Sequence, residues 1–228
     1  MDNQRAFDAL ILAGGRSSRL GGTPKQSLVY DGGTLLERAL QAAWGAECRV
    51  VVGPDPGTLP PGVLACREDP PFAGPAAAIA AGLASLAGSP GEPGAAARAP
   101  APYTLVLACD MPRADAAVER LHSEHAAAAE LHDGVVACSG DGRIQPLVGL
   151  YSTSALQKAV DTLAGRDALI NASVRSLLAS LDLQLVTVPA GSTADVDTWD
   201  DAAALGIAAG PGAQPGTGAA ADNLGGNP

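Results

Sequence analysis

Four glycines and three cations are gathered in a loop that follows the first apolar run, in the segment LILAGGRSSRLGGTPK. Gly14 and Gly15 can adopt left-handed backbone angles, which lets a ligand approach the chain closely. Backbone N–H groups in such a loop can cradle phosphate oxygens, and Arg16, Arg19 and Lys25 add positive charge for the same purpose. We therefore expect a phosphate-binding loop and disfavour the alternative, a flexible turn whose cations are only solvated.

The loop lacks two common nucleotide-binding signatures. No Gly-Lys-Ser/Thr follows the glycines, so it is not a Walker A loop, and the glycine doublet lacks the further glycine of the dinucleotide motif GxGxxG. The missing GxGxxG disfavours a Rossmann dehydrogenase. A serine hydrolase is disfavoured because no G-x-S-x-G occurs, and the three histidines, His122, His125 and His132, belong to no obvious motif.

Two acidic segments supply candidate metal ligands. Asp110, in ACDMP, directly follows an apolar run, and Asp195 and Asp197, in ADVDTW, follow the last predicted strand. Phosphate chemistry uses a hard cation such as Mg²⁺ held by one or two carboxylates, so Asp110 and Asp197 are the predicted ligands. We expect only one of Asp195 and Asp197 to face the cleft, and favour Asp197 because it directly precedes the helix cap Thr198. Turn formation and helix capping are the alternative roles.

Two turns could contact substrates. Residues 67–70 (REDP) precede an alanine-rich helix and could contact the base edge of a nucleotide, or could form a solvated turn. In GRIQPL, Arg143 lies in a turn that leads into a strand with Gln145 and Pro146, and a second substrate could bind there.

The elements that must position these residues alternate along the chain. Apolar runs predict strands at 8–13, 48–52, 63–66, 103–108, 134–138, 145–151 and 183–188. Periodicity and capping signals predict helices at 34–44, 75–86, 115–129, 154–163, 174–181 and 198–205. This alternation predicts an α/β fold, a Rossmann-like three-layer sandwich with a mostly parallel sheet and helices on both faces.

Ligands of open α/β sheets bind beyond the carboxyl ends of the strands. The glycine-rich loop, Asp110 and the segment 195–197 each follow a predicted strand. We therefore expect these three features, which are distant in sequence, to converge at one edge of the sheet.

The bulk composition limits the function classes. The chain has 228 residues and a formal net charge of -10, which argues against nonspecific binding to nucleic acid or to an anionic membrane. No apolar signal core begins the chain and no run is long enough to span a bilayer, so we expect a cytoplasmic protein. Its four cysteines have no metal-ligand spacing and predict free thiols. We expect a single domain at 1–207, with a low-complexity loop insertion at 88–102, and a disordered Gly/Ala/Pro tail at 208–228.

Several of these segments are similar to motifs of a known family. LAGGRSSRLGGTPK resembles the nucleotidyltransferase signature LAGGxSxRxGxxK, and within that superfamily the chain resembles the molybdenum cofactor guanylyltransferases. DPPFAGPAAAIAAGL resembles the family's GGPLAGI segment, ACDMP its CDMP, GRIQPLVGLY its DGRxQPLxALY, and DVDTWDDAAAL its terminal (N/D)xNTPEDL. The resemblance covers Ala9 to about Leu205.

This resemblance implies a reaction and its partners. GMP would pass from GTP to the terminal phosphate of molybdopterin with release of pyrophosphate, and Mg²⁺ would be the cofactor. Both partners are small molecules, and neither nucleic acid nor membrane is expected. The protein would be a monomer or a weak homo-oligomer, with handover contacts to molybdenum cofactor enzymes as a further expectation.

The resemblance also implies site residues. Lys25 would bind the triphosphate, Asp69 matches a position that helps to hold the nucleoside, and Asp110 would carry Mg²⁺. Lys25, Arg19 and Asp110 are the predicted catalytic residues. Nucleotide contacts are expected at Leu12, Ala13, Gly14, Gly15, Lys25, Asp69 and Asp110.

Three departures from the family pattern keep alternatives open. Gly53 stands where the family often has asparagine, TPKQ replaces xDKxL, and DVDTW replaces NVNTP. The last change moves the sequence toward cytidylyltransferase relatives. The alternatives are therefore the same reaction with CTP, transfer to a sugar phosphate or other small phosphate ester, and a non-catalytic nucleotide-binding protein of the same fold.

Overall fold

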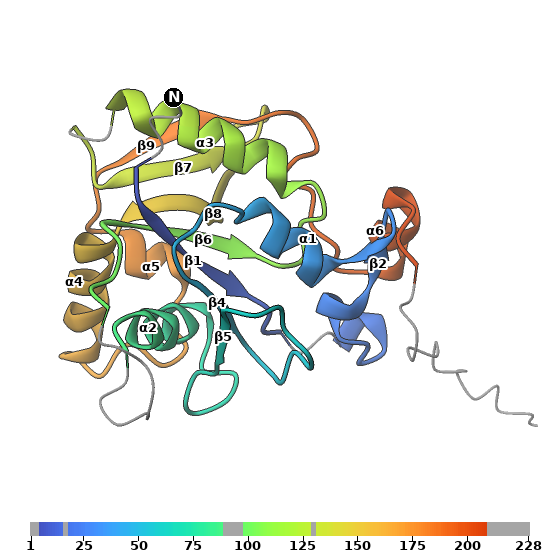
Figure 1. Ribbon diagram of the computed structural model, residues 1–228, viewed down its shortest axis with the longest axis horizontal. Coiled ribbons are helices and arrows are strands. Elements are labelled where there is room, and N and C mark those ends of the chain that lie inside the picture. Colours follow the sequence, from blue (N-terminus) through green and yellow to red (C-terminus); the bar gives the residue numbers. More distant parts are fainter. Residues whose placement is uncertain (1–4, 16–17, 89–97, 129–130, 209–228) are drawn as a thin grey trace, which may run out of the picture.

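The computed structural model describes residues 5–15, 18–88, 98–128 and 131–208 (Figure 1). Within these residues the centre of the fold is a seven-stranded sheet in the order β5-β4-β1-β6-β8-β7-β9. The strands are β1 (Phe7–Leu12), β4 (Arg49–Val52), β5 (Val63–Cys66), β6 (Tyr103–Ala108), β7 (Gly134–Cys138), β8 (Ile144–Ser152) and β9 (Leu183–Thr187). Only β8 runs antiparallel to its neighbours, so the predicted mostly parallel sheet is confirmed.

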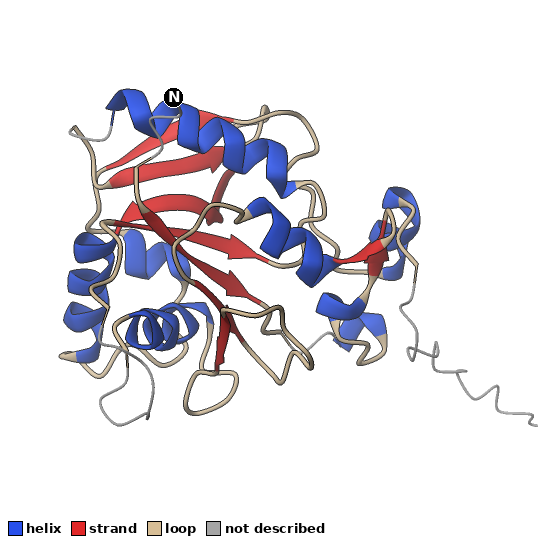
Figure 2. Ribbon diagram, viewed as in Figure 1, coloured by secondary structure: helices blue, strands red, loops and turns tan. Residues whose placement is uncertain are grey.

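Helices cover both faces of the sheet (Figure 2). Along β1, Ala9 and Ile11 pack in the core beneath α1 (Leu35–Ala42) and α3 (Ala114–Ala128). Leu10 and Leu12 pack in the opposite core, beneath the remaining helices of the sandwich, α2 (Pro75–Leu86), α4 (Thr153–Ala164) and α5 (Val174–Leu178). Successive side chains of a strand point to opposite faces, which explains why β1 is buried along its whole length. The predicted Rossmann-like three-layer sandwich is confirmed.

A smaller unit lies beside the sheet, to the right in Figure 1. It contains the 3₁₀ turns η1 (Ser18–Leu20) and η2 (Lys25–Ser27), the hairpin of β2 (Val29–Tyr30) and β3 (Gly33–Thr34), and α6 (Trp199–Leu205). Its buried residues, which we call the satellite cluster, are Leu20, Leu28, Leu35, Val196, Ala202 and Ile207. This cluster joins the loop after β1 to the C-terminal part of the described chain.

The predicted element boundaries are accurate to a few residues. Capping boxes form at Thr34 with Glu37 and at Thr198 with Asp201, as the sequence predicts. The helix predicted at 174–181 ends earlier, at Leu178. The hairpin was not predicted, because strands of two residues are too short to show periodicity.

The insertion predicted at 88–102 and the tail predicted at 208–228 fall mostly on 89–97 and 209–228, which lie outside the described residues. Among the helices that the structure describes, none is long and apolar enough to cross a membrane.

Candidate functional site

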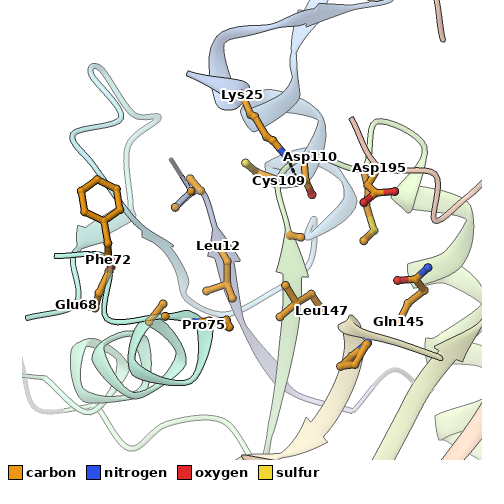
Figure 3. Close-up of a pocket in the computed structure, with 18 residues that line it drawn as sticks. Leu12, Lys25, Glu68, Phe72, Pro75, Cys109, Asp110, Gln145, Leu147 and Asp195 are labelled. Atoms are coloured by element: carbon orange, nitrogen blue, oxygen red, sulfur yellow. Dashed lines mark hydrogen bonds and ion pairs between the residues drawn. The ribbon is translucent and has the colours of Figure 1, made fainter. Parts of the chain in front are cut away.

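A cavity of about 400 Å³ opens at the carboxyl ends of β1 and β6 (Figure 3). Its floor is apolar and includes Leu12, Pro75 and Leu147. Lys25 and Asp110 form a polar end, while Glu68, Phe72 and Gln145 lie at the sides. Ligand pockets commonly combine an apolar lining with a few convergent polar groups. The cavity therefore has the chemistry of a small-molecule site, at the sheet edge that the sequence predicts.

Lys25 bridges two carboxylates that come from distant parts of the chain. Its Nζ donates a hydrogen bond to Asp110 Oδ2 at 2.9 Å and another to Asp197 Oδ1. Burial by itself would lower the pKa of Lys25, but the negative charge of Asp110 and the hydrogen bonds to both carboxylates raise it above its ordinary value. Lys25 is therefore held as a cation between the two acids.

Asp110 is fixed by the backbone on both sides. The N–H of Cys109 donates to the carbonyl oxygen of Leu12 at 3.0 Å, and the N–H of Val196 donates to the carbonyl oxygen of Asp110 at 3.0 Å. Burial raises the pKa of Asp110 above its usual range, and the adjacent Lys25 ammonium only partly offsets this. The backbone that carries this largely buried carboxyl is thus anchored just after β6.

Of the two acids at 195 and 197, one lines the cavity, and it is not the favoured Asp197. Asp195 lines the cavity beside Asp110, and Asp197 accepts the hydrogen bond from Lys25. Residues two apart in an extended segment share a face, and Val196 between them points the other way, into the satellite cluster. Both acids therefore add negative charge near Asp110, and both raise its pKa.

The remaining residues of the glycine-rich loop lie at the rim. Gly14 and Gly15 line the cavity and are exposed. Arg19 is also exposed, and its guanidinium Nη1 is 4.0 Å from Asp197 Oδ2. Arg16 lies outside the described residues. The structure thus brings Arg19 to the same group of charges as Lys25, on the solvent side.

Gly53 has a steric role at this loop. It directly follows β4 and has a φ of 153°, and a Cβ atom there would lie 2.9 Å from the carbonyl carbon of Ala13 and 2.9 Å from the nitrogen of Gly14. The absence of a side chain lets the end of β4 pack directly against the backbone that lines the cavity. Where the family pattern often has asparagine, this chain has a close backbone contact instead.

Some of the other residues predicted to contact substrates line the cavity, and others do not. Gln145 and Pro146 line the cavity from β8. Arg143 is exposed in the turn before β8, where its N–H donates to Asp141 Oδ1 at 3.1 Å, and it does not line the cavity. Asp69 is also exposed and outside the cavity wall, whereas its neighbour Glu68 is part of that wall. The roles of Arg143 and Asp69 stay predictions.

The wall residues that sequence reasoning did not propose as contacts include Glu68, Phe72, Pro75 and Leu147. The turn at 67–70 was noted as a possible base contact, but nothing in its spacing distinguishes Glu68 from Asp69. Pro75 and Leu147 belong to segments that were assigned only to a helix and a strand. Their position at the cavity depends on how this helix and this strand are placed in the fold.

The carboxylates of the site fit a magnesium ion. Asp110 and Asp197 both bind the one ammonium of Lys25, so their oxygens converge on a single cationic point. Mg²⁺ commonly takes one or two protein carboxylates and completes its shell with substrate phosphates and water. The described part of the chain contains no group of three or more His, Cys, Asp or Glu residues that could hold a metal ion.

Comparison with solved structures supports this architecture. A molybdopterin-guanine dinucleotide biosynthesis protein A from Archaeoglobus fulgidus is 18% identical, with a TM-score of 0.59 over 87% of this chain and 96% of that one. Rv0371c from Mycobacterium tuberculosis H37Rv, in complex with manganese, is 19% identical, with a TM-score of 0.57 over 88% of this chain and 97% of that one. A 2-C-methyl-D-erythritol 4-phosphate cytidylyltransferase from Thermus thermophilus is 19% identical, with a TM-score of 0.59 over 86% of this chain and 96% of that one. At these identities the likeness is one of fold.

The sequence itself identifies the family. No curated protein sequence matches this chain. The family described as MobA-like NTP transferase domain matches residues 9–186, which include the glycine-rich loop, Glu68, Asp110 and Gln145. Asp195 and Asp197 follow the matched region; Asp195 lines the cavity, and Asp197 accepts a hydrogen bond from Lys25, which also lines it. The chain therefore belongs to the MobA-like NTP transferase domain family.

Proposed function

We propose that this nucleotidyltransferase transfers GMP from GTP to the terminal phosphate of molybdopterin and releases pyrophosphate. The observation that carries the proposal is the meeting of Asp110 and Asp197 at the ammonium of Lys25, where Lys25 and Asp110 form the polar end of the cavity. The family match supports transfer from a nucleoside triphosphate. The sequence motifs shared with the molybdenum cofactor guanylyltransferases support the choice of GTP and molybdopterin.

The proposed mechanism relies on position and charge. The attacking group is a phosphate that is already ionised, so no strong general base is needed, and among the described residues no histidine lines the cavity. Backbone N–H groups at Gly14 and Gly15 would hold the phosphates, and Lys25 and Arg19 would neutralise the charge that develops on them. A bound Mg²⁺ supplies charge neutralisation and orientation of phosphate oxygens.

The residues assigned to the cation are Asp110 and Asp197. Binding of a triphosphate would draw Lys25 away from these carboxylates and leave their oxygens for the metal. The manganese complex of Rv0371c supports a divalent cation in this fold. The molybdopterin would lie on the side of Gln145 and Pro146, with Arg143 at the rim for its phosphate.

The alternative donor is CTP, since the fold is shared with a cytidylyltransferase. Thermal unfolding with GTP, CTP, ATP or UTP, each with and without Mg²⁺, distinguishes GTP from CTP as the donor. A nucleotide at about 100 times its dissociation constant adds roughly 2.7 kcal/mol of stability. We expect a Mg²⁺-dependent shift that is largest with GTP, and pyrophosphate release when molybdopterin is added.

Other outcomes would change the proposal. A larger shift with CTP would reassign the protein as a cytidylyltransferase. Nucleotide binding without pyrophosphate release from molybdopterin or any small phosphate ester would favour a non-catalytic nucleotide-binding protein. No shift with any nucleotide would contradict the proposal as a whole.

A further inference from the structure

Glu68 is a wall residue of the cavity and carries a buried carboxylate oxygen. The residue lies in the loop between β5 and α2 and is only 7% exposed. Its Oε1 accepts the N–H of Phe72 at 2.9 Å, whereas Oε2 is buried and has no hydrogen-bond partner among the residues that the structure describes. A buried acceptor without a donor is unfavourable by an amount comparable to a hydrogen bond to a charged group. Oε2 is closed off from solvent as the side chain stands, so a ligand that brings N–H donors to this wall would remove that penalty by drawing the oxygen into the cavity.

Phe72 lies at the same wall in an unusual backbone conformation. Its φ is 65°, a left-handed value that is a genuine outlier for a bulky residue and that tends to persist at ligand sites. The side chain is 46% exposed although it lines the cavity, and the guanidinium of Arg67 lies 5.1 Å from the ring centroid. The hydrogen bond to Glu68 holds this turn in place. The loop thus presents an aromatic ring and a carboxylate together (Figure 3).

These two groups lie apart from the charged end of the cavity. In Figure 3, Glu68 and Phe72 are on one side of the apolar floor formed by Leu12 and Pro75, while Lys25 and Asp110 are at the polar end. A nucleotide with its phosphates at Lys25 would extend its base over the apolar floor. The base would then reach the loop that carries Glu68.

We propose that Glu68 is the residue that selects guanine, through acceptance of the guanine N1–H and 2-amino hydrogens by its carboxylate, with Phe72 packed against the base. An ionised carboxylate can only accept hydrogen bonds. Guanine has two adjacent donors on its Watson–Crick edge. Cytosine and adenine each place a ring-nitrogen acceptor beside their single amino group, and uracil has one N–H between two carbonyl oxygens, so all three would set an acceptor against the carboxylate. This inference rests on the proposed nucleotide site.

The test uses GTP and inosine triphosphate, which lacks the 2-amino group. Isothermal titration with Mg²⁺ would measure both dissociation constants for the wild type and for Glu68→Gln, which keeps the side-chain shape and an oxygen for the Phe72 N–H. In the wild type we expect GTP to bind about tenfold to a hundredfold more tightly than inosine triphosphate, the effect of one hydrogen bond to a charged acceptor. In Glu68→Gln that ratio should fall to near one, and binding of CTP relative to GTP should increase, because the amide can donate to the cytosine ring nitrogen.

Matched variants separate base selection from a structural role. Glu119→Gln removes the same charge from an exposed position on α3 and should keep the wild-type ratio. Phe72→Ala should weaken all nucleotides while largely keeping the ratio. An equal loss of affinity for every nucleotide in Glu68→Gln would assign Glu68 to holding the loop only and would overturn the inference.

The wild-type measurement keeps the inference testable even if the variant does not fold. Equal affinity of the wild type for GTP and inosine triphosphate would overturn it, as would a preference for CTP, and both results would leave nucleotide binding intact. Failure of the wild type to bind any nucleoside triphosphate would instead contradict the proposed function itself.

Discussion

Lys25 lies between the carboxylates of Asp110 and Asp197, at the point where one cation can bind both. Its ammonium and a divalent metal would therefore compete for the same oxygens. The side chain of Lys25 is only 16% exposed, so the interaction is screened weakly by solvent. Under the proposed function, Lys25 would therefore have two opposite effects, because it would help the triphosphate to bind and would hinder binding of the metal alone.

We predict that Lys25→Met binds Mn²⁺ more tightly than the wild type in the absence of nucleotide, because the two carboxylates lose their counter-charge. The same variant should transfer nucleotide about 10²–10³ times more slowly, the usual effect of removing one charge-stabilising group from a preorganised site. Electron paramagnetic resonance of free Mn²⁺ measures the first effect and pyrophosphate release the second. Lys158→Met, an exposed change on α4, is the control. Unchanged Mn²⁺ affinity in Lys25→Met would contradict the competition.

His125 lies away from the cavity and makes the free energy of unfolding depend on pH. It is buried on α3 against Tyr103, with ring centroids 4.1 Å apart. Burial, together with the nearby charges of Arg5 and His122, lowers the pKa of His125 to about 4. The unfolded state, with a histidine pKa of about 6.5, therefore binds more protons between these values, and the free energy of unfolding must decrease as pH falls from 6.5 toward 4.

We predict that His125→Leu flattens this dependence. Between pH 6.5 and pH 4 the wild type should lose roughly 2–3 kcal/mol more stability than the variant, because the variant has no imidazole to protonate on unfolding. Urea unfolding at several pH values measures the difference. Parallel stability curves for the two proteins would show that His125 does not titrate as its burial implies.

At the scale of elements, the end of β4 and the loop after β1 are in direct backbone contact at Gly53. We predict that Gly53→Ala destabilises the protein by about 1–3 kcal/mol through backbone strain and weakens nucleotide binding, because Ala13 and Gly14 must move. Gly57→Ala is the control, since Gly57 also has positive φ but no atom lies within 4 Å of its Cβ position. Calorimetry and nucleotide titration measure both effects. Equal behaviour of the two variants would contradict the steric argument.

The order and type of the elements could be predicted because the strands are continuous apolar runs and the helices carry explicit caps, as at Thr34 and Thr198. The convergence at the sheet edge followed from the rule that parallel strands present their carboxyl ends together. The contact of Lys25 with Asp197, 172 residues apart, could not be derived, because it depends on the satellite cluster. Glu68 could not be distinguished from its neighbour Asp69 for a similar reason. Its burial arises from a loop conformation, which leaves no periodic pattern in the sequence.

At the scale of the whole molecule, the protein is acidic, but basic side chains lie where the phosphates of the proposed nucleotide would bind. The net charge of -10 repels anions at long range, and Lys25 and Arg19 act against that field only locally. Their positions depend on a core separate from the two cores of the sheet. The satellite cluster is therefore the structural link between the fold and the charged end of the cavity.

Leu28 allows that link to be tested without any change in charge. It is fully buried in the satellite cluster, three residues after Lys25, in the same cluster as Val196, which directly precedes Asp197. We predict that Leu28→Ala lowers stability by about 2–5 kcal/mol, as large-to-small changes in a core do, and also weakens binding of the Mg²⁺–nucleotide complex. Leu121→Ala, an equally buried change in the core beneath α3, should cause a similar loss of stability and leave nucleotide affinity unchanged.

Hydrogen exchange would locate the cause of this difference. In Leu28→Ala, protection should fall in both η2 and α6, although they are distant in sequence, while β1 and β6 keep theirs, because the satellite cluster can loosen without opening the sheet. In Leu121→Ala the loss should be confined to α3 and the strands beneath it. If both variants weaken nucleotide binding equally, the affinity follows global stability, and the satellite cluster has no specific role in holding Lys25 against Asp197.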